Sequence, residues 1–112
     1  MEEIVTYEAI CKAAERLKGK IVRTPLLKSE HLNKYLNTNL YLKAENLQTI
    51  GAFKFRGAMN TILQLPEDVK KVVAWSSGNH AQAVAAAAKI TGRDATIVMP
   101  EDSPKIKLDG TS

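Results

Sequence analysis

The stretch VKKVVAWSSGNHAQAVAAAAKITGRDATIVM, residues 69–99, decides the fold. Residues 69–75 and 95–99 are short apolar runs typical of buried strands, and residues 79–90 form an alanine-rich helical run that Gly92 ends. A strand, a helix and a strand at this spacing predict a βαβ unit with parallel strands and a right-handed crossover. The predicted fold class is therefore α/β, a parallel sheet with helices on both faces.

The N-terminal half contains weaker signals for secondary structure. Apolar residues at helical spacing predict a helix over 7–17 with Thr6 as its N-cap, and Ser29 is placed to cap a short helix that ends at Leu36. Alternation predicts a strand over 40–45, with a loop after it. A further helix over 53–65 would end before a proline.

The bulk properties are those of one small soluble domain. The chain has 112 residues, 45% of them hydrophobic and 25% charged, and a net charge of +4. Its lysines are scattered rather than clustered with aromatic residues, so we expect no nucleic-acid partner. The sequence has no long apolar run, so we expect no membrane partner either. The only cysteine, Cys11, rules out an internal disulfide and is expected to be a packed thiol. The sequence shows no signal peptide and no long apolar run, so we expect the cytoplasm.

Lys54 is the first candidate for chemistry. It follows a glycine-bearing turn and would lie at the start of a helix, where the positive helix end favours a neutral, nucleophilic amine. The flanking rings of Phe53 and Phe55 could desolvate the amine, and Arg56 would add like charge. By spacing alone, an ordinary exposed lysine in a first helical turn remains the more frequent case.

The second candidate is the turn at residues 76–80, between a strand and a helix. Backbone N–H groups at a helix start converge on one spot, Gly78 allows close approach, and the serines add donors, which suits a carboxylate or a phosphate. The alternative is that Ser77 or Asn79 only caps the helix. His80 has no partner at metal-ligand spacing, so we expect no metal site.

Taken together, these stretches are specific to one family. The blocks follow one another in family order over nearly the whole chain: RTPL (23–26), YLKAENLQ (41–48), GAFKFRGA (51–58), SSGNHAQ (76–82) and MPEDSPK (99–105). The chain resembles the N-terminal part of the fold-type II pyridoxal-phosphate enzymes, most closely the threonine (serine) dehydratases and the related serine racemases.

The resemblance implies a role for each site residue. Lys54 would bind pyridoxal 5′-phosphate as the internal aldimine and later move the substrate α-proton. Phe53 would pack beside the cofactor, and Asn79 would bond its ring hydroxyl. Ser77 is where the racemases carry a second acid/base, although dehydratases often have the same serine. The substrate carboxylate would be held by Ser76, Ser77, Gly78, Asn79 and His80.

The implied reaction is β-elimination of water from threonine or serine, which yields a 2-oxo acid and ammonia. The resemblance implies amino-acid metabolism, isoleucine biosynthesis among its possible roles, and a small-molecule amino-acid substrate in a homo-oligomer. Two alternatives stay open, a serine racemase and a non-catalytic α/β module that associates with itself.

The resemblance also implies that residues 1–112 are the N-terminal part of such an enzyme. Residues 1–50 would be an N-terminal segment with the first strand, and residues 51–112 the lysine helix with a βαβ small domain. The glycine-rich phosphate loop and the residue that contacts the pyridine nitrogen would come from later segments. We therefore expect no catalysis by these residues alone.

Overall fold

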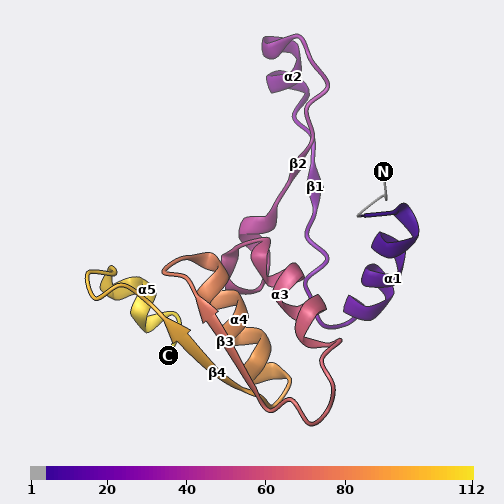
Figure 1. The fold of residues 1–112 in the computed structure, drawn as a ribbon. Helices are drawn as coiled ribbons and strands as arrows, with labels where there is room; N and C mark the ends of the chain where they lie inside the picture. Colours follow the sequence, from indigo (N-terminus) through magenta and orange to yellow (C-terminus); the bar gives the residue numbers. More distant parts are fainter. Residues whose placement is uncertain (1–4) are drawn as a thin grey trace.

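The computed structural model describes residues 5–112, and its centre is the predicted βαβ unit (Figure 1). Strand β3 (Lys71–Trp75) leads into helix α4 (Asn79–Ile90) and then into strand β4 (Asp94–Val98). The two strands pair in parallel, with a register that runs from Lys71 opposite Asp94 to Trp75 opposite Val98. The parallel α/β class is confirmed, and α4 has the bounds that the sequence predicted.

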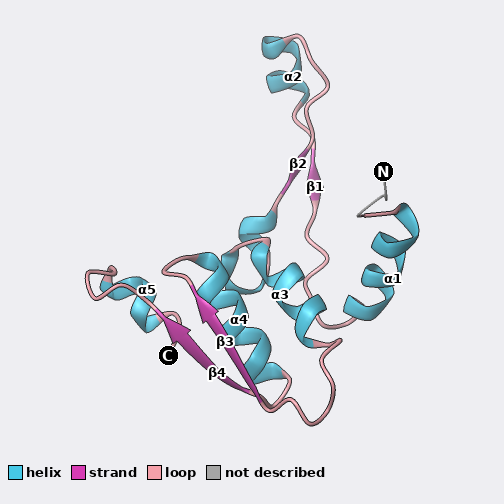
Figure 2. Ribbon diagram, viewed as in Figure 1, coloured by secondary structure: helices cyan, strands magenta, loops and turns pink. Residues whose placement is uncertain are grey.

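Helix α4 lies against the sheet on one side and against helix α3 (Lys54–Ile62) on another (Figure 2). Phe55 and Met59 of α3 are fully buried, and so are several alanines of α4. Alanine combines the highest helix propensity with a side chain that allows close approach, so an alanine-rich helix suits a central position. We call α3, β3, α4 and β4 the body.

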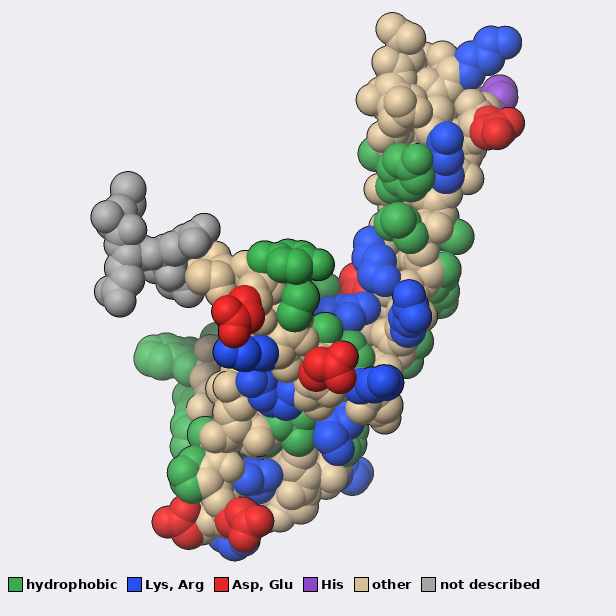
Figure 3. All heavy atoms as spheres, turned by 90° about the vertical axis from the view of Figure 1, so that its right-hand side faces the viewer, with side chains coloured by type: hydrophobic (Ala, Val, Ile, Leu, Met, Phe, Trp, Pro, Cys, Tyr) green, Lys and Arg blue, Asp and Glu red, His purple; other side chains and the backbone are tan. Residues whose placement is uncertain are grey.

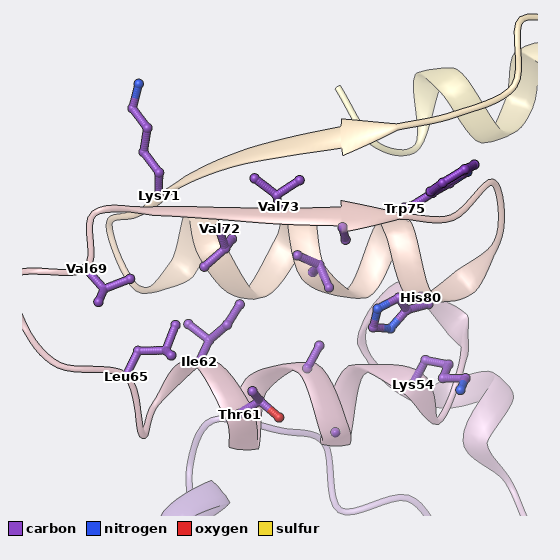
Figure 4. Close-up of a pocket in the computed structure, with 14 residues that line it drawn as sticks. Lys54, Thr61, Ile62, Leu65, Val69, Lys71, Val72, Val73, Trp75 and His80 are labelled. Atoms are coloured by element: carbon purple, nitrogen blue, oxygen red, sulfur yellow. The ribbon is translucent and has the colours of Figure 1, made fainter.

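The two faces of β3 differ in burial. Ala74 is buried and Val72 half-buried on the face toward the helices, whereas Val73 and Trp75 are 73% and 81% exposed on the other face. Figure 4 shows Val72 pointing toward α3, and Val73 and Trp75 pointing away from it. The apolar runs predicted buried strands, and within the described residues this is wrong for the outer face of β3.

Residues 26–44 form an arm that projects from the body (Figure 1). It comprises strand β1 (Leu26–Leu27), helix α2 (Glu30–Leu36) and strand β2 (Leu42–Lys43), with β1 and β2 antiparallel. The predicted N-cap is confirmed, because Ser29 Oγ accepts a hydrogen bond from the Leu32 N–H at 3.2 Å. The strand predicted over 40–45 is shorter than expected, since its partner strand is only two residues long.

Helix α1 (Tyr7–Leu17) has its predicted bounds, and Thr6 caps it through the Ala9 N–H. Its expected apolar face is not a core, however, since Leu17 is the only buried residue in it. Cys11 is exposed, so the packed thiol was a wrong prediction. Helix α5 (Lys105–Asp109) was not predicted. Within residues 5–112, no helix is both long and apolar enough to span a membrane.

Candidate active site around Lys54

A sharp turn before α3 places Lys54 at the first position of that helix. Ile50 and Gly51 have φ values of 64° and 72°, both in the left-handed region, and the Gly51 N–H donates to the Gln48 carbonyl at 2.7 Å. A left-handed β-branched residue is rare, and such strained positions cluster at functional sites. The chain thus reverses just before the lysine.

The Lys54 amine is exposed and lies beside one aromatic ring. Its Nζ is 5.6 Å from the centroid of the Phe53 ring, and that ring is itself 61% exposed. Phe55, in contrast, is fully buried among the core side chains. The desolvation expected from both flanking rings is therefore not found among the described residues, and only Phe53 accompanies the amine.

The loop after β3 leaves the start of α4 uncapped. Ser76 Oγ accepts from the Gly78 N–H at 3.2 Å, and the Ser76 N–H donates to the Val98 carbonyl at 3.1 Å. Gly78 is the N-cap residue, and no side chain caps the helix. The alternative that Ser77 or Asn79 only caps α4 is therefore wrong. The first-turn N–H groups lack intrahelical acceptors and can bind an anion.

The space over this loop is open. A Cβ built on Gly78 would meet no atom within 4 Å. Ser77 is half-buried, whereas Asn79 and His80 are exposed. The loop at the start of α4 is therefore at least partly accessible at Gly78, Asn79 and His80.

A groove of about 750 Å³ runs between α3 and β3 (Figure 4). Lys54 and His80 lie at one end of it, and Leu65 and Val69 lie at the other. The structure therefore brings together one residue from each predicted motif. Five further predicted residues lie outside this groove: Phe53 beside the lysine, and Ser76, Ser77, Gly78 and Asn79 in or next to the loop.

Sequence reasoning missed a polar cluster on the other side of α3. Arg56 donates through Nε to Glu45 Oε2 at 2.8 Å and through Nη2 to Glu45 Oε1 at 2.7 Å. Thr24 donates its hydroxyl to the same carboxylate, and Lys43 Nζ donates to the Thr24 carbonyl at 2.6 Å. Arg56 was expected to add uncompensated charge near Lys54, and this is wrong because Glu45 pairs with it.

The pairing changes the ionisation of Glu45. Hydrogen bonds from Arg56, and a smaller contribution from Thr24, outweigh the effect of burial and lower the pKa of Glu45 from 4.5 to about 2. The same bonds raise the pKa of Arg56. Both side chains thus stay charged over the ordinary pH range, and the pair is a permanent structural element beneath the lysine helix.

Gln48 ties the turn before Lys54 to the extended segment before the arm. Its Oε1 accepts from the N–H groups of Val22 and Thr49, both at 3.0 Å, and its Nε2 donates to the Val22 carbonyl at 2.9 Å. The residues of this cluster occur in the family blocks quoted above, and that occurrence is the only signal in the sequence that could have pointed to them.

Comparison with known proteins identifies the group to which this site belongs. Residues 17–111 match the family described as pyridoxal-phosphate dependent enzymes. The chain is 48% identical over 111 residues to the L-threo-3-hydroxyaspartate ammonia-lyase of Saccharomyces cerevisiae, covering 97% of this chain and 34% of that protein. It is also 48% identical to a catabolic L-threonine dehydratase of Staphylococcus aureus, covering 96% and 32%.

Solved structures agree with the sequence relatives. The maize serine racemase superposes with a TM-score of 0.91 at 39% identity, over 97% of this chain and 34% of that one. The chain thus spans about a third of the length of the relatives it matches. A match over most of the chain, with ammonia-lyases, dehydratases and a racemase among its relatives, shows that this chain belongs to the pyridoxal-phosphate dependent enzyme family.

Proposed function

We propose that this chain carries the cofactor-binding lysine of an ammonia-lyase that removes water from threonine or serine. The observation that carries the proposal is the position of Lys54 and His80 at one end of the same groove. The uncapped start of α4 next to His80 adds an anion site beside the amine.

The residues present fit one part of pyridoxal phosphate, its aldehyde end. The exposed Lys54 amine has no hydrogen-bond or ion-pair partner among residues 5–112, and the Phe53 ring beside it offers an apolar surface. Exposed Asn79 begins α4 and could reach a ring hydroxyl. When bound, the cofactor supplies an electron-withdrawing ring that stabilises negative charge at the substrate α-carbon.

Residues of this chain would bind the substrate and transfer its α-proton. The N–H groups at the start of α4 and the side chains of Ser76, Ser77 and His80 would bind the substrate carboxylate. That contact would orient the α-hydrogen toward Lys54. Lys54 Nζ would then accept the α-proton, and the β-hydroxyl would leave as water. The resulting enamine, once released, would be hydrolysed by a water molecule to a 2-oxo acid and ammonia.

The experiment is to locate the lysine that binds the cofactor. The 112-residue chain is incubated with pyridoxal phosphate, reduced with borohydride and mapped by mass spectrometry. Lys54 should carry most of the reduced cofactor. Before reduction, Lys54→Ala should abolish the absorbance band of the cofactor bound to the lysine. Lys71 lines the far end of the same groove, so Lys71→Ala is the matched control and should keep both. Labelling spread evenly over exposed lysines would contradict the proposal.

Substrate choice is a second question. Threonine, serine and hydroxyaspartate are added in turn to the cofactor-loaded chain, and the change in Lys54-dependent absorbance is followed. The structure offers no contact that separates them, but the ammonia-lyase and dehydratase relatives support a hydroxy amino acid. An equal change in absorbance with alanine, which lacks a β-hydroxyl, would mean that this site does not select hydroxy amino acids.

Racemisation of serine is the second candidate, supported by the likeness to the maize enzyme and by Ser77 in the loop. Chiral analysis of the products of a full-length enzyme that contains these residues distinguishes the two, since D-serine would accumulate in a racemase and pyruvate in a lyase. Ser77→Ala should then suppress D-serine more than pyruvate.

A non-catalytic, self-associating module is supported by exposed Val73 and Trp75, and sedimentation with and without cofactor tests it.

A further inference from the structure

A second pocket lies apart from Lys54, where α1 and the base of the arm meet. It has a volume of about 620 Å³ and is lined by the end of α1 and the loop after it, with Lys43 and Arg56 opposite. We call it the junction pocket. Neither Lys54 nor the loop at residues 76–80 contributes to its lining, so it is separate from the proposed active site.

The junction pocket is rich in positive charge. Its charged lining residues are Lys18, Arg23, Lys43, Arg56 and a single acid, Glu15. Figure 3 shows Lys and Arg side chains gathered on this side of the molecule, where the arm joins the rest. A concave surface lined by one sign of charge concentrates its field and attracts the opposite charge.

Two of these cations are held in place by the polar cluster. Glu45 holds Arg56 through two hydrogen bonds and neutralises its charge. Arg56 therefore forms part of the pocket wall but adds little to its positive charge. Lys43 Nζ donates to the Thr24 carbonyl at 2.6 Å, and that acceptor is neutral. The charge of Lys43 is therefore fixed in the pocket wall and not compensated by its partner.

The other two cations have no ion-pair partner in the part of the chain that the structure describes. Among residues 5–112, the ion pairs within 4.0 Å are Lys12 with Glu8 and Arg56 with Glu45, so Lys18 and Arg23 are in neither. Glu15 can offset only one charge. An excess of positive charge thus remains, with the Arg23 guanidinium available for two parallel hydrogen bonds to a phosphate or carboxylate.

The lining also has an apolar part, from Ala14, Leu17 and Ile21. We propose that the junction pocket binds a small organic molecule with at least two negative charges, held by Lys18, Arg23 and Lys43. Phosphate and carboxylate groups share the required chemistry. The volume of the junction pocket falls within the range of small-molecule sites. It is larger than a single inorganic ion requires.

The test is calorimetric titration of the 112-residue chain with pyrophosphate and, separately, with citrate at low ionic strength. Saturable binding is expected, and the tighter of the two probes identifies the preferred acidic group. Arg23→Gln should weaken binding about tenfold, because it removes a charge-assisted bidentate contact. Lys18→Gln should weaken it by a smaller factor. Lys34→Gln, on exposed α2, is the charge-matched control and should change nothing.

Two controls separate this site from Lys54. Lys54→Ala should leave pyrophosphate affinity unchanged, and Arg23→Gln should leave the borohydride labelling of Lys54 unchanged. The proposal is overturned if neither probe binds saturably, or if Lys34→Gln weakens binding as much as Arg23→Gln. Circular dichroism of each variant verifies the fold, and Lys18→Glu provides a second test at an exposed position if Arg23→Gln does not fold.

Discussion

The body and the arm are stabilised in different ways. In the body, Phe55 and Met59 are fully buried between packed elements. In the arm, Tyr35 is 82% exposed and Asn33 is the only buried residue of α2. Asn33 Oδ1 accepts from the Leu40 N–H at 3.0 Å, and Ser29 caps the helix. The body thus depends on apolar packing, whereas the arm depends on local hydrogen bonds, and an isolated two-stranded ribbon is marginal in water.

The largest expected effect tests that contrast directly. Phe55→Ala removes a fully buried ring and should lower the free energy of unfolding by about 3–5 kcal/mol. Tyr35→Ala, in the arm, should change it by less than about 0.5 kcal/mol. Urea denaturation followed by circular dichroism measures both. Met59→Leu, at under about 1.5 kcal/mol, keeps the comparison measurable if Phe55→Ala does not fold. Similar losses of unfolding free energy in Phe55→Ala and Tyr35→Ala would contradict the contrast between the body and the arm.

A smaller effect is expected at the cluster that joins the two regions. The folded-state pKa of Glu45, about 2, lies below its ordinary 4.5, so its pairing stabilises the fold fully above pH 4.5. This contribution, about 2 kcal/mol after allowance for solvent screening, is lost as the pH falls from about 4.5 toward 2. Glu45→Gln should remove that pH dependence.

Thermal unfolding at pH 7 and at pH 3 measures the change. Glu30→Gln, on the exposed start of α2, provides the matched control and should leave the acid profile of the parent chain intact. An unchanged profile in Glu45→Gln would mean that the ion pair between Glu45 and Arg56 does not contribute the acid-dependent stability.

The smallest effects concern the backbone around Lys54 and have opposite signs. Gly51 has a φ of 72°, so Gly51→Ala should cost about 1–2 kcal/mol. Gly57 lies inside α3, where a Cβ would meet nothing within 4 Å, so Gly57→Ala should stabilise by about 0.5–1 kcal/mol. Denaturant titration of the pair measures both. A Gly51→Ala variant as stable as the parent chain would show that the turn does not need its left-handed geometry.

The elements of the body were predictable because their signals are local. Helix α4 has its predicted bounds, since an alanine run lies between a glycine-bearing turn and Gly92. The apolar run of β3 predicted a strand, but such a run by itself does not reveal which of its two faces another element covers. The arm's short strands differ from prediction for a related reason, since each pairs only with the other.

The candidate site was predicted in part. The sequence indicated Lys54 and the start of α4, and the structure brings Lys54 and His80 to one groove. The cluster of Thr24, Glu45 and Arg56 escaped, because its members are 11 to 32 positions apart and contact each other only in three dimensions. The pairing of Arg56 was missed for the same reason.

The alanines of α4 have a consequence for the proposed chemistry. Ala81, Ala83, Ala87 and Ala88 are fully buried, and a methyl group has no rotamers to sample. The α4 side of its contact with α3 therefore offers few rotatable side chains, and Phe55 and Met59 of α3 fill the space between the two helices. Heating, which populates alternative rotamers elsewhere, should leave the spacing between these helices almost constant. The distance between the backbone of Lys54 and the first turn of α4 would then change little with temperature.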